Sequence, residues 1–199
     1  MPDLFAFILF AFVTSITPGP NNVMVAAAAA NHGVRATVPH MLGISLGFGF
    51  MVALVGLGLA GPLAASPALH AGLRWVGVAW MLWIAWGMVR ADPAAPSGGG
   101  TVAAPLGVGA AALFQWVNPK AWVLAIVAST AYTTPGRALV GQALSHGALF
   151  ALVGWPCFLS WALLGAGAGR VLRSPVQWRV FNATMAALLI LSILPLLTH

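Results

Sequence analysis

Charge is what this sequence lacks most. Only 5% of its 199 residues are charged, and the two acids, Asp3 and Asp92, stand against eight bases. In a soluble domain about 25% of residues are charged. Ten charges cannot cover a soluble protein of this length, which excludes that class. The apolar runs are continuous rather than alternating, which also excludes a transmembrane β-barrel. The composition therefore predicts an all-α integral membrane protein.

Other absences narrow the function. The single cysteine, Cys157, excludes an internal disulfide and a multi-cysteine metal site. The bases are scattered singly, so no basic stripe predicts a nucleic-acid partner. No acid lies within an apolar run, which argues against metal transport and against a cationic substrate. Hydrolase motifs and phosphate-binding glycine loops are also missing, so we expect neither an enzyme nor a metal or other cofactor.

Six apolar segments are long enough to cross a bilayer, which needs about 20 residues per helix. They cover residues 4–30, 38–60, 69–89, 106–131, 139–166 and 179–197, with turn-forming residues between them. A Pro- and Gly-rich stretch at 93–105 is typical of a flexible linker. We therefore expect one membrane domain made of two three-helix repeats, 1–92 and 106–199. Because three is odd, the repeats should have inverted orientations.

Basic residues in short loops predict how the chain is oriented. The loops after the first, third and fifth spans hold five arginines: Arg35, Arg90, Arg170, Arg173 and Arg179. The opposite side has Arg74 and Arg137. Because basic loops tend to stay in the cytoplasm, we expect both termini in the periplasm. The first apolar run is too long for a cleaved signal peptide, so it is expected to be retained.

An unusual polar segment interrupts the first span. It consists of Thr17, Pro18, Gly19, Pro20, Asn21 and Asn22. The two prolines remove two backbone donors, which leaves the carbonyls of Thr14 and Ile16 without helical partners. Such backbone must be buried in protein or line a wet cavity. This cluster predicts a functional break rather than an ordinary proline kink.

The fourth span contains a second break, at Gln115, Asn118, Pro119 and Lys120. Pro119 is expected to free the carbonyl of Gln115. A cation at mid-membrane is expensive and indicates function, and from there the lysine stem cannot reach an interface. Pro18 and Pro119 lie 101 residues apart, each in the first span of its half. Paired broken helices in inverted halves are the best sequence indicator of a transporter's midplane site.

One cation, freed carbonyls and amide side chains suit a zwitterionic ligand. We expect its carboxylate to pair with Lys120 and its ammonium to bind the carbonyls of Thr14 and Ile16 together with Asn21 or Asn22. The predicted substrate-binding set is Thr17, Pro18, Gly19, Pro20, Asn21, Asn22, Gln115, Asn118, Pro119 and Lys120. His40 and His146 are expected to be packed or interfacial rather than proton relays.

These motifs resemble a known family. The segment 17–22, Asn31-His-Gly-Val-Arg35 and Gly43-Ile-Ser-Leu-Gly47 resemble the N-terminal signature of the LysE/RhtB family of amino-acid exporters, and Asn118-Pro-Lys120 resembles its second motif. The resemblance implies a six-helix exporter in the bacterial inner membrane, driven by the proton gradient. Many members carry an Asp after the glycine matching Gly47, where this chain has Phe48. The features closest to the cysteine/O-acetylserine exporter branch are Phe48 after Ser45-Leu46-Gly47, Trp83-Ile-Ala-Trp86 and Trp161-Ala-Leu-Leu-Gly165.

Several alternatives remain open at this point. The branch implies a small neutral amino acid as substrate, while homoserine, threonine, leucine or a toxic analogue would suit the same family. A passive channel or a membrane scaffold would use the breaks only as kinks. Gly43, Gly47 and Phe48 are expected to serve helix packing and gating, because the glycines let neighbouring helices approach closely and slide. A second interpretation is that such small-residue faces form contacts in a homodimer.

Overall fold

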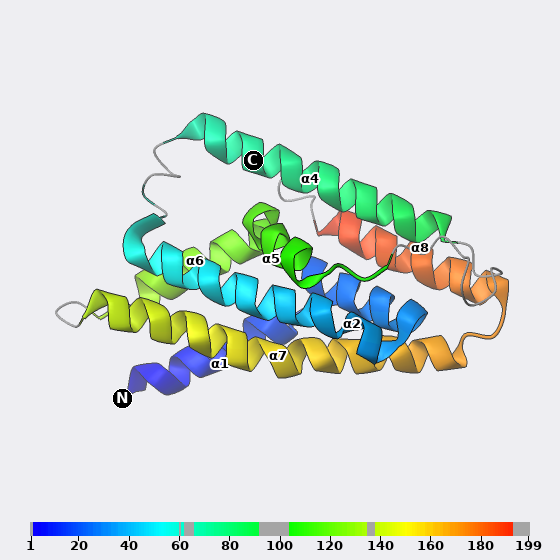
Figure 1. The fold of residues 1–199 in the computed structure, drawn as a ribbon, viewed down its shortest axis with the longest axis horizontal. Coiled ribbons are helices and arrows are strands. Elements are labelled where there is room, and N and C mark those ends of the chain that lie inside the picture. Colours follow the sequence, from blue (N-terminus) through cyan, green and yellow to red (C-terminus); the bar gives the residue numbers. More distant parts are fainter. Residues whose placement is uncertain (1, 60, 62–65, 92–103, 135–137, 193–199) are drawn as a thin grey trace.

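The computed structural model describes residues 2–59, 61, 66–91, 104–134 and 138–192, and every regular element within them is a helix. The elements are α1 (Pro2–Ile16), α2 (Pro20–Leu54), the π-helical η1 (Val55–Leu59), α4 (Pro67–Arg90), α5 (Val108–Val117), α6 (Pro119–Tyr132), α7 (Leu139–Val171) and α8 (Pro175–Leu191). They form one elongated bundle (Figure 1). The all-α prediction is confirmed. Most of the expected linker, Arg137 and the end of the sixth expected span lie outside the described residues.

Proline marks where helices begin. Pro20, Pro119 and Pro175 each occupy the first turn of a helix, where a missing N–H costs nothing. At α8 a capping box adds to this effect. Ser174 Oγ accepts from the Gln177 N–H at 3.2 Å, and Gln177 Oε1 accepts from the Ser174 N–H at 3.1 Å. The prolines in the apolar runs therefore set the helix boundaries.

The helix α2 reverses direction within its length (Figure 1). Gly33 has φ 80° and ψ 163°, outside the helical region and at a positive φ that glycine tolerates best. Val25 and Ala29, before the turn, share one buried cluster with Met41 and Ile44, after it. In a straight helix Ala29 and Met41 would be about 18 Å apart. The two parts of α2 therefore form a hairpin.

Fewer of the described helices meet the length and hydropathy required of a membrane span than the six spans predicted from the sequence. Within the described residues, Pro20–Leu59, Ala71–Arg90 and Leu139–Val171 are long and apolar enough to cross a membrane. The pair α5 and α6, bent by 74°, counts as a fourth span if the bend lies within it. The broken first span and the 17-residue α8 fall short of that length criterion. The six-span count and the inverted repeats stay predictions.

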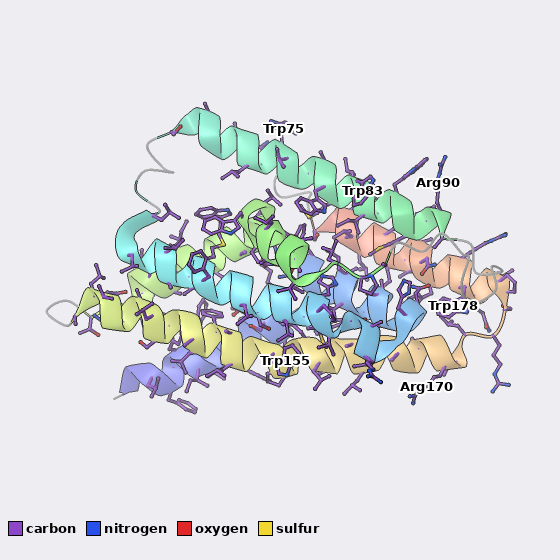
Figure 2. All side chains as sticks on the ribbon, in the orientation of Figure 1. Trp75, Trp83, Arg90, Trp155, Arg170 and Trp178 are labelled. Carbon is purple, nitrogen blue, oxygen red and sulfur yellow. The ribbon has the colours of Figure 1, made fainter. Side chains whose placement is uncertain are left out.

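Apolar side chains cover the outside of the bundle. Phe5, Leu152 and Val171 are each more than 70% exposed, and large exposed apolar residues continue along α4 and α8. Such a surface is typical of a protein surrounded by lipid rather than water. Arg90 and Arg170 lie with Trp178 at the end of the bundle where α2 reverses (Figure 2). We call this the arginine end.

Glycines allow the helices to touch through their backbones. Gly43 and Gly47 lie against α5, and Gly165 and Gly169 lie against the first part of α2. At each of these four positions a Cβ atom would overlap backbone atoms of the facing helix. Small residues of this kind let membrane helices approach closely. Since α2 makes its most extensive contacts with α7 and then α5, these glycines support the centre of the fold.

Candidate functional site

The structure brings the two predicted breaks together. The first lies between α1 and α2, where Gly19 has an extended backbone and precedes Pro20. The second is Asn118, also extended, between α5 and α6. Asn118 caps α6, because its Oδ1 accepts from the Lys120 N–H at 3.1 Å. Two segments about a hundred residues apart thus meet inside one bundle.

Lys120 crosses from the second break to the first. Its Nζ donates to the carbonyl oxygens of Thr17 at 2.9 Å and of Pro18 at 3.4 Å. Its stem lies over Gly19, where a Cβ atom would be 3.0 Å from Lys120 Cδ. An ammonium has three donors, so two carbonyls leave one for a ligand. A Cβ at position 19 would therefore crowd the Lys120 side chain where it reaches the broken backbone.

Asn21 and Gln115 form a reciprocal amide pair between the breaks. Asn21 Nδ2 donates to Gln115 Oε1 at 2.9 Å, and Gln115 Nε2 donates to Asn21 Oδ1 at 3.2 Å. Gln115 is fully buried, and its Nε2 also donates to the carbonyl of Ala111 at 2.9 Å. Buried amides need such partners, so this pair joins the two breaks directly.

Asn22 presents an acceptor without a partner. Its Nδ2 donates to the carbonyls of Ser15 at 2.9 Å and Thr17 at 2.8 Å. Two carbonyl partners fix the orientation of the amide, because only the NH₂ group can donate to both. Asn22 is 2% exposed, and its Oδ1 has no hydrogen-bond partner in the described part of the chain. A buried carbonyl oxygen of this kind is suited to an ammonium or hydroxyl donor.

Two of the backbone carbonyls expected to lack hydrogen-bond partners accept hydrogen bonds in the structure. Trp161 Nε1 donates to the carbonyl of Ile16 at 3.0 Å, and the backbone N–H of Asn118 donates to that of Gln115 at 3.2 Å. The prediction that Pro119 frees Gln115 was therefore wrong, because a tighter last turn closes α5. Trp161 lies 145 residues from Ile16, and no pattern in the sequence marks it as a partner.

A small cavity lies where the breaks meet. Its volume is about 30 Å³. Seven members of the predicted set line it: Gly19, Pro20, Asn21, Asn22, Gln115, Asn118 and Lys120. Thr17, Pro18 and Pro119 do not, and the first two instead supply the carbonyls for Lys120. Thr14 and Phe48 join the lining, while Gly43 and Gly47 stay in the helix contact.

Aromatic rings fill the bundle between this cavity and the end opposite the arginine end. Phe48 packs edge-on against Phe150 at 4.9 Å between ring centroids. Phe150 packs in the same way against Phe7 at 5.4 Å, and Phe7 continues to Tyr132 and stacks on His146 at 4.3 Å. We call these five residues the aromatic plug. The sequence analysis singled out Phe48 and expected His146 to be packed or interfacial. It did not predict Phe7, Tyr132 and Phe150, which come from three other helices.

Comparison with known proteins identifies the family of this chain. The family profile described as LysE type translocator matches residues 12–198. A cysteine/O-acetylserine efflux protein of Salmonella typhimurium is 34% identical over 94% of this chain and 93% of its own length. The protein of the same name from Escherichia coli is 31% identical over the same shares. No solved structure matches the chain significantly. The match spans both breaks and nearly the whole length, so this multi-pass membrane protein belongs to the LysE family of translocators.

Proposed function

We propose that the protein is a secondary exporter of small neutral amino acids or their derivatives, of the cysteine and O-acetylserine type, across the bacterial inner membrane. The observation that carries this proposal is that Lys120 and Asn22, whose Oδ1 is buried without a described partner, line the same cavity at the junction of two broken helices. A cation and an unpartnered acceptor are complementary to the two ends of a zwitterion. The names of the relatives, which describe efflux of such compounds, support the substrate class.

The proposed ligand site keeps the carboxylate end expected from the sequence and narrows the ammonium end. The substrate carboxylate binds the remaining donor of Lys120. Its ammonium binds Asn22 Oδ1 beside Thr14, because the Ile16 carbonyl is held by Trp161 and Asn21 is held by Gln115. No described lining residue is an acid, so a second positive charge on the substrate has no partner. Lysine and arginine are therefore poor substrates.

The size of the cavity implies a conformational change. A water molecule needs a cavity of about 10–15 Å³, so a cavity of about 30 Å³ holds roughly two waters and no amino acid. Admitting the substrate requires the breaks to separate, which opens the Lys120 contacts and the Asn21–Gln115 pair. Alternating access follows if the two halves rock about this junction while the aromatic plug closes one side. The cytoplasmic side is the arginine end.

Transport by the purified chain in proteoliposomes tests the proposal. We expect uptake of labelled cysteine or O-acetylserine that an uncoupler reduces, with threonine and leucine weaker and lysine absent. Lys120→Ala should abolish uptake, because the carboxylate loses its cation. The matched control is Val123→Ala on the same helix, whose side chain is 60% exposed and does not line the cavity. Flux that Lys120→Ala leaves unchanged contradicts the proposal, and flux without counterflow or uncoupler sensitivity indicates a channel.

Membrane orientation needs its own test. Cys157 is buried and is the only cysteine, so Cys157→Ser gives a background without thiols. In that background we expect Arg173→Cys, at the arginine end, to react with an impermeant maleimide only from the cytoplasm. Labelling from the periplasm of intact cells would reverse the proposed orientation.

A further inference from the structure

A second cavity lies between α2, α4, α8 and the segment 104–106 that precedes α5. Its volume is about 200 Å³, and it shares no lining residue with the cavity at Lys120. Three polar side chains line it, Asn31, His40 and Asn182, from the two parts of α2 and from α8. Trp83 lines it from α4, on the stretch that leads to Arg90 at the arginine end (Figure 2).

His40 is the polar group in this cavity that the protein does not satisfy. It is 2% exposed, and neither ring nitrogen has a hydrogen-bond partner among the described residues. Asn31, in contrast, is tied to the protein, because its Nδ2 donates to the carbonyl of Ala27 at 2.7 Å and to Asn182 Oδ1 at 3.4 Å. A neutral imidazole offers one donor and one acceptor. Both nitrogens of this lining residue are therefore buried, and no described residue satisfies either of them.

The rest of the wall is apolar and uncharged. Met24, Ile84, Met88 and Leu106 contribute aliphatic surface, and Trp86 adds an aromatic ring. Arg90 stacks over the Trp86 ring at 4.2 Å but does not itself line the cavity. No charged side chain is among the lining residues. A charged ligand would lose its hydration here without gaining a partner.

We propose that this cavity is a binding site for a small uncharged amphipathic molecule, one with an apolar body and a single hydroxyl or amide head that hydrogen-bonds to His40. An apolar cavity of about 150 Å³ accepts benzene, so a single-ring alcohol fits the available volume. A lipid acyl chain would fill the same space but leave both ring nitrogens unpartnered. Dependence on His40 therefore separates the two occupants.

Binding of three matched probes to the purified full chain in detergent tests this site. The probes are 4-fluorobenzyl alcohol, 4-fluorotoluene, which lacks the hydroxyl, and 4-fluorobenzoate, which is charged. Fluorine NMR measures saturable binding, with unlabelled benzyl alcohol as competitor. We expect saturable binding of the alcohol, about tenfold tighter than that of 4-fluorotoluene, since a hydrogen bond to a buried group contributes about that factor. The benzoate should not bind.

Variants locate the binding. His40→Phe keeps a ring of similar size and removes both nitrogens, so alcohol binding should weaken about tenfold. His146→Phe is the matched control, because His146 stacks on Phe7 outside this cavity and should leave binding unchanged. Lys120→Ala should also leave it unchanged, which keeps this result independent of the proposed transport. No saturable binding overturns the proposal, as does equal binding of toluene and alcohol that is insensitive to His40→Phe.

Discussion

The amide pair between the two breaks gives a prediction that does not depend on the identity of the substrate. Asn21→Ala removes both hydrogen bonds that join the side chains of Asn21 and Gln115. It leaves Gln115 Oε1 without its donor in a fully buried position. Gln115→Ala removes the same two bonds from the other side. Each single variant should therefore be destabilised, and the double variant should cost less than the sum.

The magnitude follows from the two bonds. A hydrogen bond between side chains contributes about 0.6 kcal/mol on average in a membrane protein, with a maximum of about 1.7 kcal/mol. An orphaned buried polar group adds a penalty of about 1–3 kcal/mol. We therefore expect each single variant to lose about 2 kcal/mol of unfolding free energy and the pair to show a coupling of about 1–2 kcal/mol.

Reversible unfolding in mixed micelles, followed by circular dichroism, measures these values in a double-mutant cycle. The exchanged variant, Asn21→Gln with Gln115→Asn, keeps both amides and the total side-chain length, so it should recover at least half of the coupling. Losses in the single variants that add within about 0.5 kcal/mol would refute a direct interaction. So would an exchanged variant no more stable than the double alanine variant.

Two further predictions concern packing and backbone satisfaction. Gly165→Ala should destabilise the fold by about 1–3 kcal/mol because its Cβ overlaps the first part of α2. Gly167→Ala, with open space on the same helix, should be neutral or stabilising by up to about 1 kcal/mol, and equal effects in the same unfolding assay would contradict the close contact. Trp161→Phe should cost about 1–3 kcal/mol by orphaning the Ile16 carbonyl. Trp155→Phe is its matched control, and an equal loss there would mean that ring volume, not the indole N–H, matters.

The positions of the breaks could be predicted because their causes are local. A proline removes its own N–H wherever the chain goes, so Pro20 and Pro119 begin helices in the structure as their covalent geometry requires. The apolar runs likewise follow from composition, since a helix in lipid must be apolar over its length. That the two breaks frame one site followed from the inverted-repeat argument. The bonds from Lys120 to the carbonyls of Thr17 and Pro18 were not part of that prediction.

The partners of individual polar groups could not be predicted, because they come from distant segments. Nothing near Ile16 indicates that the indole of Trp161 will satisfy its carbonyl. Whether Asn22 binds a ligand or the backbone is decided by the positions of Ser15 and Thr17 in three dimensions. His40 was expected to be packed, and it is buried, but the sequence could not show that α4 and α8 leave space beside it.

The bond between Lys120 and the first break has a consequence for how the protein is made. The carbonyls that hold the Lys120 ammonium belong to Thr17 and Pro18, which are synthesised more than a hundred residues earlier. A lysine at the centre of a span costs about 3 kcal/mol when a single helix leaves the translocon for lipid. Pairing with the carbonyls of the first break offsets part of that cost for the segment formed by α5 and α6. We therefore expect α5 and α6 to insert more readily when the segment around Thr17 and Pro18 is already in the bilayer than when they are expressed alone.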